Sequence, residues 1–245
     1  MKSLAIATFF VFALSGLAAA KAPPTYIAQA VADPTRPKDD TASDALRDPA
    51  DTLAFAGVKP GMKVGELAPG GGYFTRMLSD VVGPRGKVYG LENARWKEAV
   101  EADQKFIAEL HRSNISLDVE PWGQFKLPQK VDLFWITQNY HDLHIAKYGV
   151  VDMAAFNRRV FDALKPGGRY FILDHQGAAG LTDAQISTLH RIDKAQLISE
   201  VTAAGFKLVK EGDFLHRPAD DHSKSIFDPA IRGHTDQYAL LFVKP

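Results

Sequence analysis

The sequence predicts an α/β fold built on a doubly wound, mostly parallel sheet of seven strands with a C-terminal antiparallel hairpin. Strand-like and helical segments alternate between residues 63 and 243, and a glycine-rich turn joins the first strand to the helix that follows it. The segment VDLFWIT at 131–137 is almost entirely apolar. Such alternation gives parallel strands with helices on both faces, so that a central strand is buried on both sides.

The predicted strands are short segments rich in β-branched and aromatic residues. In chain order we expect strands at Lys63–Leu67, Lys87–Leu91, Ile115–Val119, Val131–Thr137, Arg169–Leu173, Phe206–Glu211 and Tyr238–Val243. The last two are separated by a long loop and form the predicted hairpin.

The predicted helices carry start and stop signals. Asp48 and Pro49 are an N-cap residue and a proline at the first helical position, and Gly57 ends that helix. Asp193 and Gln196 have the spacing of a capping box. The remaining helices are expected at Phe74–Val82, Trp96–Leu110, Asp152–Leu164 and Asp193–Ala204.

The first 20 residues have the features of a secretory signal peptide. Lys2 supplies a basic start, Leu4–Leu14 an apolar stretch and Ala18–Ala20 a small-residue cleavage pattern. An uncleaved anchor is the alternative, because residues 4–20 are only slightly shorter than the roughly 20 residues that span a bilayer. We expect cleavage, export to the periplasm or the medium, and no stable membrane insertion of the mature chain.

The mature chain divides into two parts. Residues 21–47 are rich in Pro, Asp and Ala without a sustained period, which indicates a tail packed loosely on the rest. Residues 48–245 are predicted to form one domain.

Composition excludes several classes of function. Lys plus Arg and Asp plus Glu both number 29, so no net positive charge favours nucleic acid or an anionic membrane. The sequence contains no cysteine, which excludes disulfides, thiolate nucleophiles and cysteine-ligated metals. We therefore expect a small-molecule substrate and no nucleic-acid partner.

The sharpest motif is the turn after the first strand, where Glu66 is followed by Ala68-Pro69-Gly70-Gly71-Gly72. Glycines are needed where the backbone takes positive φ or lies against a ligand. No Gly-Lys-Ser/Thr follows, which excludes a phosphate-binding P-loop, and Thr75 stands where a dinucleotide site has its third glycine. An acid beside the turn favours a cationic ligand. A tight strand–helix connection without a ligand is the alternative.

This stretch resembles the nucleotide-binding motif of class I S-adenosylmethionine-dependent methyltransferases, E/D-x-G-x-G-x-G, with Ala68 in place of the first glycine. Glu92, after the second strand, matches the family's ribose-binding acid, and Leu164–Asp174 is similar to the family's segment around the fifth strand. The chain looks closest to an exported group of predicted methyltransferases. The resemblance implies a Rossmann-like fold and S-adenosyl-L-methionine as cofactor, bound by Glu66, Ala68, Pro69, Gly70, Gly71, Gly72, Glu92 and Asn139.

The segment after the fourth strand holds the candidate catalytic residues. His141 is a candidate general base with an apparent pKa of about 6–7, with Asp142 as its partner, and Tyr140 could orient a ligand. The alternative is that Asp142 caps a helix and His141 bonds a loop carbonyl. His141, His144 and Asp142 could instead ligate a metal, but no fourth ligand stands at a fixed spacing, so no metal site is predicted.

Other candidates follow the third and fifth strands. His175 is a candidate substrate contact and His190 a third catalytic candidate, whereas Asp193 is read as a helix N-cap. Trp122 could stack on adenine, although a core position is the more common role of such a tryptophan.

The loop 212–237 is long for a hairpin and is expected beside the glycine turn. We interpret it as a lid that brings Arg232, His222 and Asp221 to a substrate. The alternative is an ordered surface loop braced by Asp228-Pro229.

These observations favour methyl transfer to a small molecule by in-line displacement at the donor methyl group. A non-catalytic exported module that binds S-adenosylmethionine or a related nucleoside is the second hypothesis. An NAD-type oxidoreductase is the third.

Overall fold

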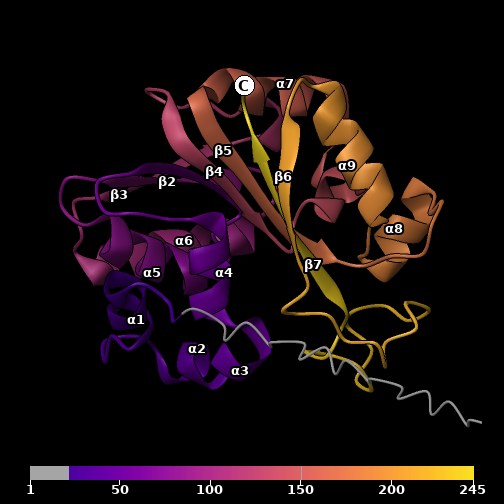
Figure 1. The fold of residues 1–245 in the computed structure, drawn as a ribbon, viewed down its shortest axis with the longest axis horizontal. Coiled ribbons are helices and arrows are strands. Elements are labelled where there is room, and N and C mark those ends of the chain that lie inside the picture. The colour runs from indigo at the N-terminus through magenta and orange to yellow at the C-terminus, as the bar shows by residue number, and fades with distance from the viewer. Residues whose placement is uncertain (1–21, 150) are drawn as a thin grey trace, which may run out of the picture.

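The computed structural model describes residues 22–149 and 151–245, and the predicted signal peptide at 1–20 lies outside the described residues (Figure 1). Within these described residues, seven strands form one sheet in the order β3-β2-β1-β4-β5-β7-β6. Their bounds are β1 Lys63–Leu67, β2 Lys87–Asn93, β3 Ile115–Glu120, β4 Val131–Thr137, β5 Leu164–His175, β6 Lys207–Gly212 and β7 Gln237–Val243.

The strand directions confirm the predicted fold class. The strands β1 to β5 pair in parallel, and β7 pairs antiparallel with both β5 and β6. The order reverses at β1, which lies between β2 and β4. In such sheets the crevice at the carboxyl ends of the strands on either side of this point is where ligands bind.

The helices follow the predicted alternation with small shifts at their ends. They are α4 Pro49–Ala56, α5 Tyr73–Val82, α6 Lys97–Leu110, α7 Met153–Ala163, α8 Asp183–Leu189 and α9 Lys194–Ala203. Short 3₁₀ turns lie at Trp122–Gln124, His141–His144 and Ala146–Tyr148. Asp193 caps α9, as predicted. Gln196 does not complete a capping box, because its side chain donates to Glu200; the capping box of this region is Thr182–Gln185 on the unpredicted α8.

The sheet separates two hydrophobic cores. Residues of β1 and β4 alternate between them: Val64 and Trp135 face the core formed with α1, α4 and α5, whereas Leu67 and Phe134 face the core formed with α7, α8 and α9. This alternation is what a strand pleat dictates when both faces are covered.

The segment before α4 differs from its prediction. Residues 22–47 contain three short helices, α1 Thr25–Val31, α2 Lys38–Ala42 and α3 Asp44–Arg47. Ile27 and Ala30 of α1 are buried in the core against α4 and α5. The expectation of loose packing is therefore wrong for this segment. Two apolar side chains at helical spacing enter the core, and Asp40 and Asp44 contact Arg76 and Tyr73 of α5.

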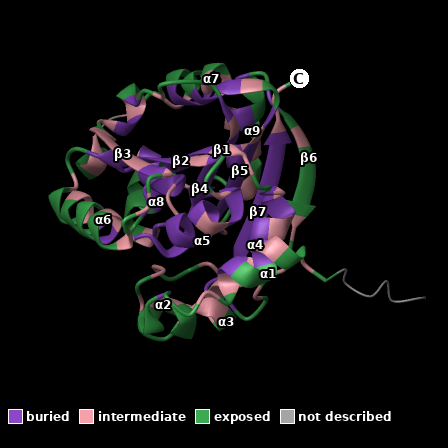
Figure 2. Cartoon of the chain, turned by 90° about the vertical axis from the view of Figure 1, so that its left-hand side faces the viewer, coloured by how far each residue is buried: buried purple, intermediate pink, exposed green. Residues whose placement is uncertain are grey.

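Exposure varies strongly across the sheet, from the buried inner strands to β6 at one edge (Figure 2). In the described part of the chain, no helix is both long and apolar enough to cross a membrane.

Candidate active site

The glycine turn is a run of left-handed backbone conformations. Ala68, Gly70, Gly71 and Gly72 have φ values of 52°, 58°, 79° and 90°. A Cβ on Gly72 would lie 2.7 Å from the ring of Phe106. Glycine is thus required at 72 both for its conformation and for space.

An acid in the middle of α6 holds this turn in place. Asp103 is fully buried, and its Oδ1 accepts a hydrogen bond of 2.9 Å from the backbone N–H of Gly71. No sequence motif predicted a role for Asp103. Its signal was present, since Asp103 falls on the apolar stripe of the helix between Val100 and Phe106, where a charged side chain needs a partner.

A cavity of about 320 Å³ lies at the carboxyl ends of β1, β4 and β5. Its wall combines the glycine turn with the segments after β4 and β5 and with the 213–236 loop. The lining residues are Arg47, Glu66, Ala68, Pro69, Gly70, Tyr73, Phe74, Trp96, Thr137, Gln138, Asn139, His141, Asp142, Tyr148, His175, His190, Ile226 and Phe227. Most of the predicted site residues therefore come together; Gly71, Gly72, Glu92, Tyr140 and Arg232 are not among the lining residues of this cavity.

Two acids at the ends of β1 and β2 are buried beside the turn. Burial raises the pKa of Glu66 and of Glu92 to about 8, and the nearby Asp103 carboxyl adds to both shifts. Among the described residues, neither Glu66 Oε2 nor Glu92 Oε2 has a hydrogen-bond partner. A buried carboxyl oxygen without a hydrogen-bond donor is costly, so two of them at this turn indicate a ligand that supplies the missing donors.

An aromatic pair forms another part of the wall. The rings of Trp96 and Tyr148 lie 5.2 Å apart, and Asn93 Nδ2 donates to the carbonyl of Tyr148. Trp122 is 1% exposed in the core behind Tyr148, so the core alternative for this residue is the one that the structure supports. The sequence indicated Trp96 only as an apolar helix residue. In the structure it lines the cavity, where its ring could stack on a nucleobase.

Arg47, at the end of α3, brings a cation to the cavity. Its guanidinium lies 4.1 Å from the centre of the Tyr73 ring, and burial lowers its pKa. Its Nε has no hydrogen-bond partner in the described chain. No sequence signal pointed to it, because it belongs to the segment read as a tail.

The segment after β4 is fixed by buried acids. His141 donates its backbone N–H to Asp174 Oδ2, its Nδ1 lies 2.7 Å from Asp174 Oδ1, and its Nε2 lies 3.3 Å from Asp142 Oδ1. Burial would lower the pKa of His141, but these two carboxylates outweigh it and raise the pKa to about 10. That value differs from the 6–7 that the general-base hypothesis assumed. Asn139 donates to Asp142 Oδ2.

Two side chains of the same segment point into a different cluster. Tyr140 is fully buried, and its hydroxyl donates to Glu200 while accepting from Asn157. His144 contacts Glu200 and Asp183. Neither Tyr140 nor His144 is among the described residues that line the cavity. The structure therefore does not support Tyr140 as a ligand-orienting residue or His144 as a metal ligand together with His141 and Asp142.

His190 takes the place beside Asp142 that the sequence analysis considered for His144. Its φ is 55°, its Nδ1 lies 3.2 Å from Asp142 Oδ1, and its ring packs edge-on against Phe227. A parallel β-bridge between Gln176 and Ile192 holds the segment that follows His190 beside the segment that follows β5.

His175 lines both this cavity and a second one of about 380 Å³. Its Nδ1 lies 2.8 Å from the Thr235 hydroxyl, and burial lowers its pKa to about 3, so the ring is neutral. Arg47, Gln138, Ile226 and Phe227 also line both cavities, and Arg232 lines the second.

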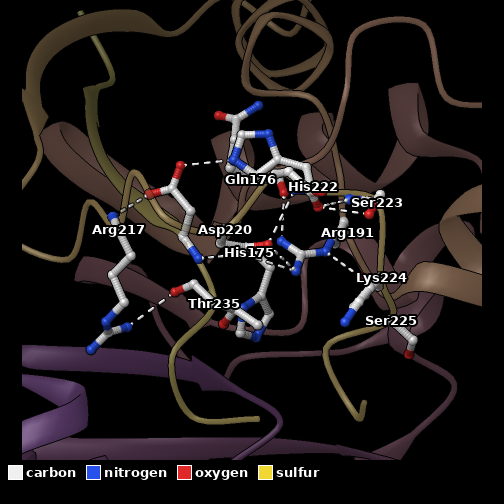
Figure 3. Close-up of polar contacts among 12 residues, drawn as sticks. His175, Gln176, Arg191, Arg217, Asp220, His222, Ser223, Lys224, Ser225 and Thr235 are labelled. Carbon is white, nitrogen blue, oxygen red and sulfur yellow. Dashed lines mark hydrogen bonds and ion pairs between the residues drawn. The ribbon is translucent and has the colours of Figure 1, made fainter. Parts of the chain in front are cut away.

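The 213–236 loop is pinned at several points (Figure 3). Arg191 is fully buried, pairs with Asp220 and donates to the carbonyls of Gln176 and Lys224. His222 pairs with Asp236, away from the cavities, and Asp221 accepts from Ser223. These contacts favour the ordered-loop alternative. Asp228 braces the loop from within, since its Oδ1 accepts from the Ala230 N–H, and Arg191 adds a second brace from outside the loop. Arg232 is the lid candidate that does reach a cavity.

Comparisons with known proteins agree with the family resemblance of the sequence. A family model described as a methyltransferase domain matches residues 58–228. No curated protein matches the sequence. Solved structures match the fold at low identity. An S-adenosylmethionine-dependent methyltransferase from Aquifex aeolicus is 18% identical with a TM-score of 0.59, covering 84% of this chain and 99% of its own.

Two further structures widen that comparison. Fibrillarin from Aeropyrum pernix, with natively bound S-adenosyl-L-methionine, is 18% identical with a TM-score of 0.52, covering 82% of this chain and 76% of its own. The [4+2]-cyclase SpnF is 16% identical with a TM-score of 0.59, covering 84% and 80%. At identities this low, the structural similarity establishes the fold alone.

Proposed function

The chain belongs to the methyltransferase-domain family within the class I S-adenosylmethionine-dependent superfamily, and we propose that it transfers a methyl group from S-adenosyl-L-methionine to a small-molecule acceptor. The observation that carries this proposal is the pair of buried acids, Glu66 and Glu92, beside a turn of left-handed glycines; in the described chain, Oε2 of each acid has no hydrogen-bond partner. We also propose that the chain belongs to the exported group of methyltransferases that its sequence resembles.

The donor complements these groups in detail. Its sulfonium and ammonium charges suit the acid of Glu66, and its ribose hydroxyls suit Glu92. Trp96 and Tyr148 offer an aromatic surface for adenine, and Arg47 offers a guanidinium for the carboxylate of the methionine part. Asn139, Ala68, Pro69 and Gly70 complete the donor side of the cavity wall.

The second cavity supports a small acceptor. It shares Arg47, Gln138, His175 and Phe227 with the first, so that an acceptor there would approach a donor held at the glycine turn. Methyl transfer requires an acceptor atom, the methyl carbon and the sulfur in line, with water excluded. Neutral His175 is placed to hydrogen-bond the acceptor, and Arg232 favours an acceptor that carries negative charge.

Calorimetry tests the proposal directly. The purified protein should bind S-adenosylmethionine and its demethylated product S-adenosylhomocysteine, and it should not bind NAD. A donor carrying a labelled methyl group should then pass the label to a low-molecular-weight fraction of a cell extract. Binding of NAD alone would overturn the proposal.

A binding module without turnover is the second candidate. It is motivated by the signal-like segment, since the donor is made in the cytoplasm, and by the cyclase SpnF, whose name shows that this fold hosts other reactions. Tight donor binding with no label transfer would favour the module.

A further inference from the structure

A second kind of site is built into the same cavity from His141, Asp142 and His190. One ligand atom from each of these residues lies within 4.8 Å of the others, and all three residues are buried. The Nε2 of His141 and the Nδ1 of His190 lie 3.3 and 3.2 Å from the same oxygen, Asp142 Oδ1. We propose that these three side chains bind a divalent transition-metal ion of the zinc class.

The distances fit an ion between the three atoms. Tetrahedral bonds of about 2.0–2.1 Å place neighbouring ligand atoms about 3.3–3.4 Å apart. The two contacts of Asp142 Oδ1 have this length. Yet within the described chain this oxygen accepts no hydrogen bond, although the residue is 4% exposed. A buried carboxylate oxygen without a hydrogen bond is expected to have another partner, and a bound ion would supply one.

The surrounding contacts have the form that supports metal ligands. Metal-bound histidines usually give their other ring N–H to a carboxylate. His141 Nδ1 lies 2.7 Å from Asp174 Oδ1, so Nε2 is the ring nitrogen that faces the site, and an ion bound there takes the place of its proton. The second oxygen of Asp142 accepts from Asn139. Asp174 and Asn139 are thus positioning residues for two of the three ligands.

Charge balance points the same way. Asp142 and Asp174 are two buried carboxylates that share one histidine between them. A dication with two neutral imidazoles neutralises both acids. Imidazole nitrogen favours zinc-class ions over magnesium or calcium, which prefer oxygen ligands. Because all three ligands line the cavity, the remaining coordination positions face its interior.

An ion at this place has a defined chemical use. It would bind a lone pair of the acceptor and lower the pKa of a coordinated hydroxyl. That use rests on the proposed function, whereas the site itself does not, since metal binding is measured without donor or acceptor.

Full-length protein treated with a chelator and then titrated with Zn²⁺ by calorimetry tests the site. We expect one equivalent to bind, with no competition from excess Mg²⁺. His190→Asn should weaken Zn²⁺ by about 100-fold or more, and Asp174→Asn by about 10–100-fold. Asparagine is chosen at 190 because it tolerates positive φ.

The matched control is His222→Asn. His222 also has positive φ, at 63°, and also pairs with an acid, Asp236, but it lies outside both cavities. Zn²⁺ should raise the Tm of wild type and His222→Asn, and not that of His190→Asn. Should His190→Asn fail to fold in chelator, Asp142→Asn replaces it with the same expectation. Absence of Zn²⁺ binding by wild type, or undiminished binding by the His190 variant, would overturn the site.

Discussion

The carboxylate of Asp103 and the backbone N–H of Gly71 are joined by a hydrogen bond of 2.9 Å that ties α6 to the glycine turn. The turn needs this support because four of its residues hold left-handed conformations. Its shape therefore depends on a helix that begins only after the next strand of the chain.

We expect Asp103→Ala to weaken S-adenosylmethionine binding by about 1–2 kcal/mol, because the Gly71 N–H loses its buried partner. Asp103→Asn keeps an acceptor oxygen at the same place and should bind almost as the wild type does. Calorimetry on both variants measures the difference. Equal loss in the two would mean that the charge, and not the hydrogen bond, is what the turn requires.

Gly72→Ala should lose donor binding and destabilise the fold, because a Cβ at this position collides with the ring of Phe106. Gly61→Ala is the matched control: its φ is 82°, but a Cβ there meets nothing within 4 Å. The control should cost only about 1 kcal/mol of backbone strain and keep the donor. Thermal unfolding and calorimetry separate the two effects. Wild-type affinity in Gly72→Ala would refute the assignment of the turn.

Glu92→Ala should weaken donor binding by roughly 1.5–3 kcal/mol, since charge-assisted hydrogen bonds to the ribose are lost. Glu120→Ala removes an exposed acid from the end of the neighbouring strand and should leave affinity unchanged. Titration calorimetry measures both. Unchanged affinity in Glu92→Ala would remove this acid from the donor site.

Stability should fall as pH rises through the range set by Glu66. Its pKa is about 8 in the fold against an ordinary 4.5, so the folded chain holds a proton that the unfolded chain has released. Between those values each pH unit should cost up to about 1.4 kcal/mol per proton. Glu66→Gln cannot ionise and should flatten this decline in denaturant titrations at pH 5, 7 and 9.

Donor binding gives a second readout of the same acid. A sulfonium ligand favours the charged carboxylate, so binding near pH 7 should release protons and the affinity should rise with pH. Calorimetry in buffers of different ionisation enthalpy measures the release. It should shrink in Glu66→Gln and persist in Glu120→Gln; a full release in the Glu66 variant would contradict the assignment.

The mass of the recovered protein tests whether the chain is exported and its signal segment removed. The chain recovered from the periplasm or the medium should begin at Lys21, because Ala18–Ala20 precedes the expected cleavage point. A chain of full mass held in the membrane fraction would instead identify the segment as an anchor.

The fold was predictable because its signals are local. The apolar run 131–137 indicated the central strand, and the glycines after Glu66 indicated the turn, without knowledge of distant residues. The two sheet neighbours of β7 and the capping of α8 were harder to predict from the sequence, since each depends on how distant segments pack in the folded chain.

The site was predictable only in part. Glu66, Asn139, His141 and His190 do meet in one cavity, as residues at the ends of parallel strands should. Arg47 and Trp96 were missed because neither carries a motif, and Tyr140 faces the core because the 3₁₀ turn after β4 rotates neighbouring side chains to opposite sides. Periodicity predicts which residues lie near a strand end, but not the direction in which each points.

The place of β7 between β5 and β6 has a consequence for how the protein is made. The ribosome completes β6 before it completes β7, yet β6 joins the sheet through β7 alone within the described structure. A nascent chain therefore carries β6 as an unpaired ribbon until residues 237–243 emerge. In the described structure, β6 can therefore join the sheet only after β7 has paired with β5.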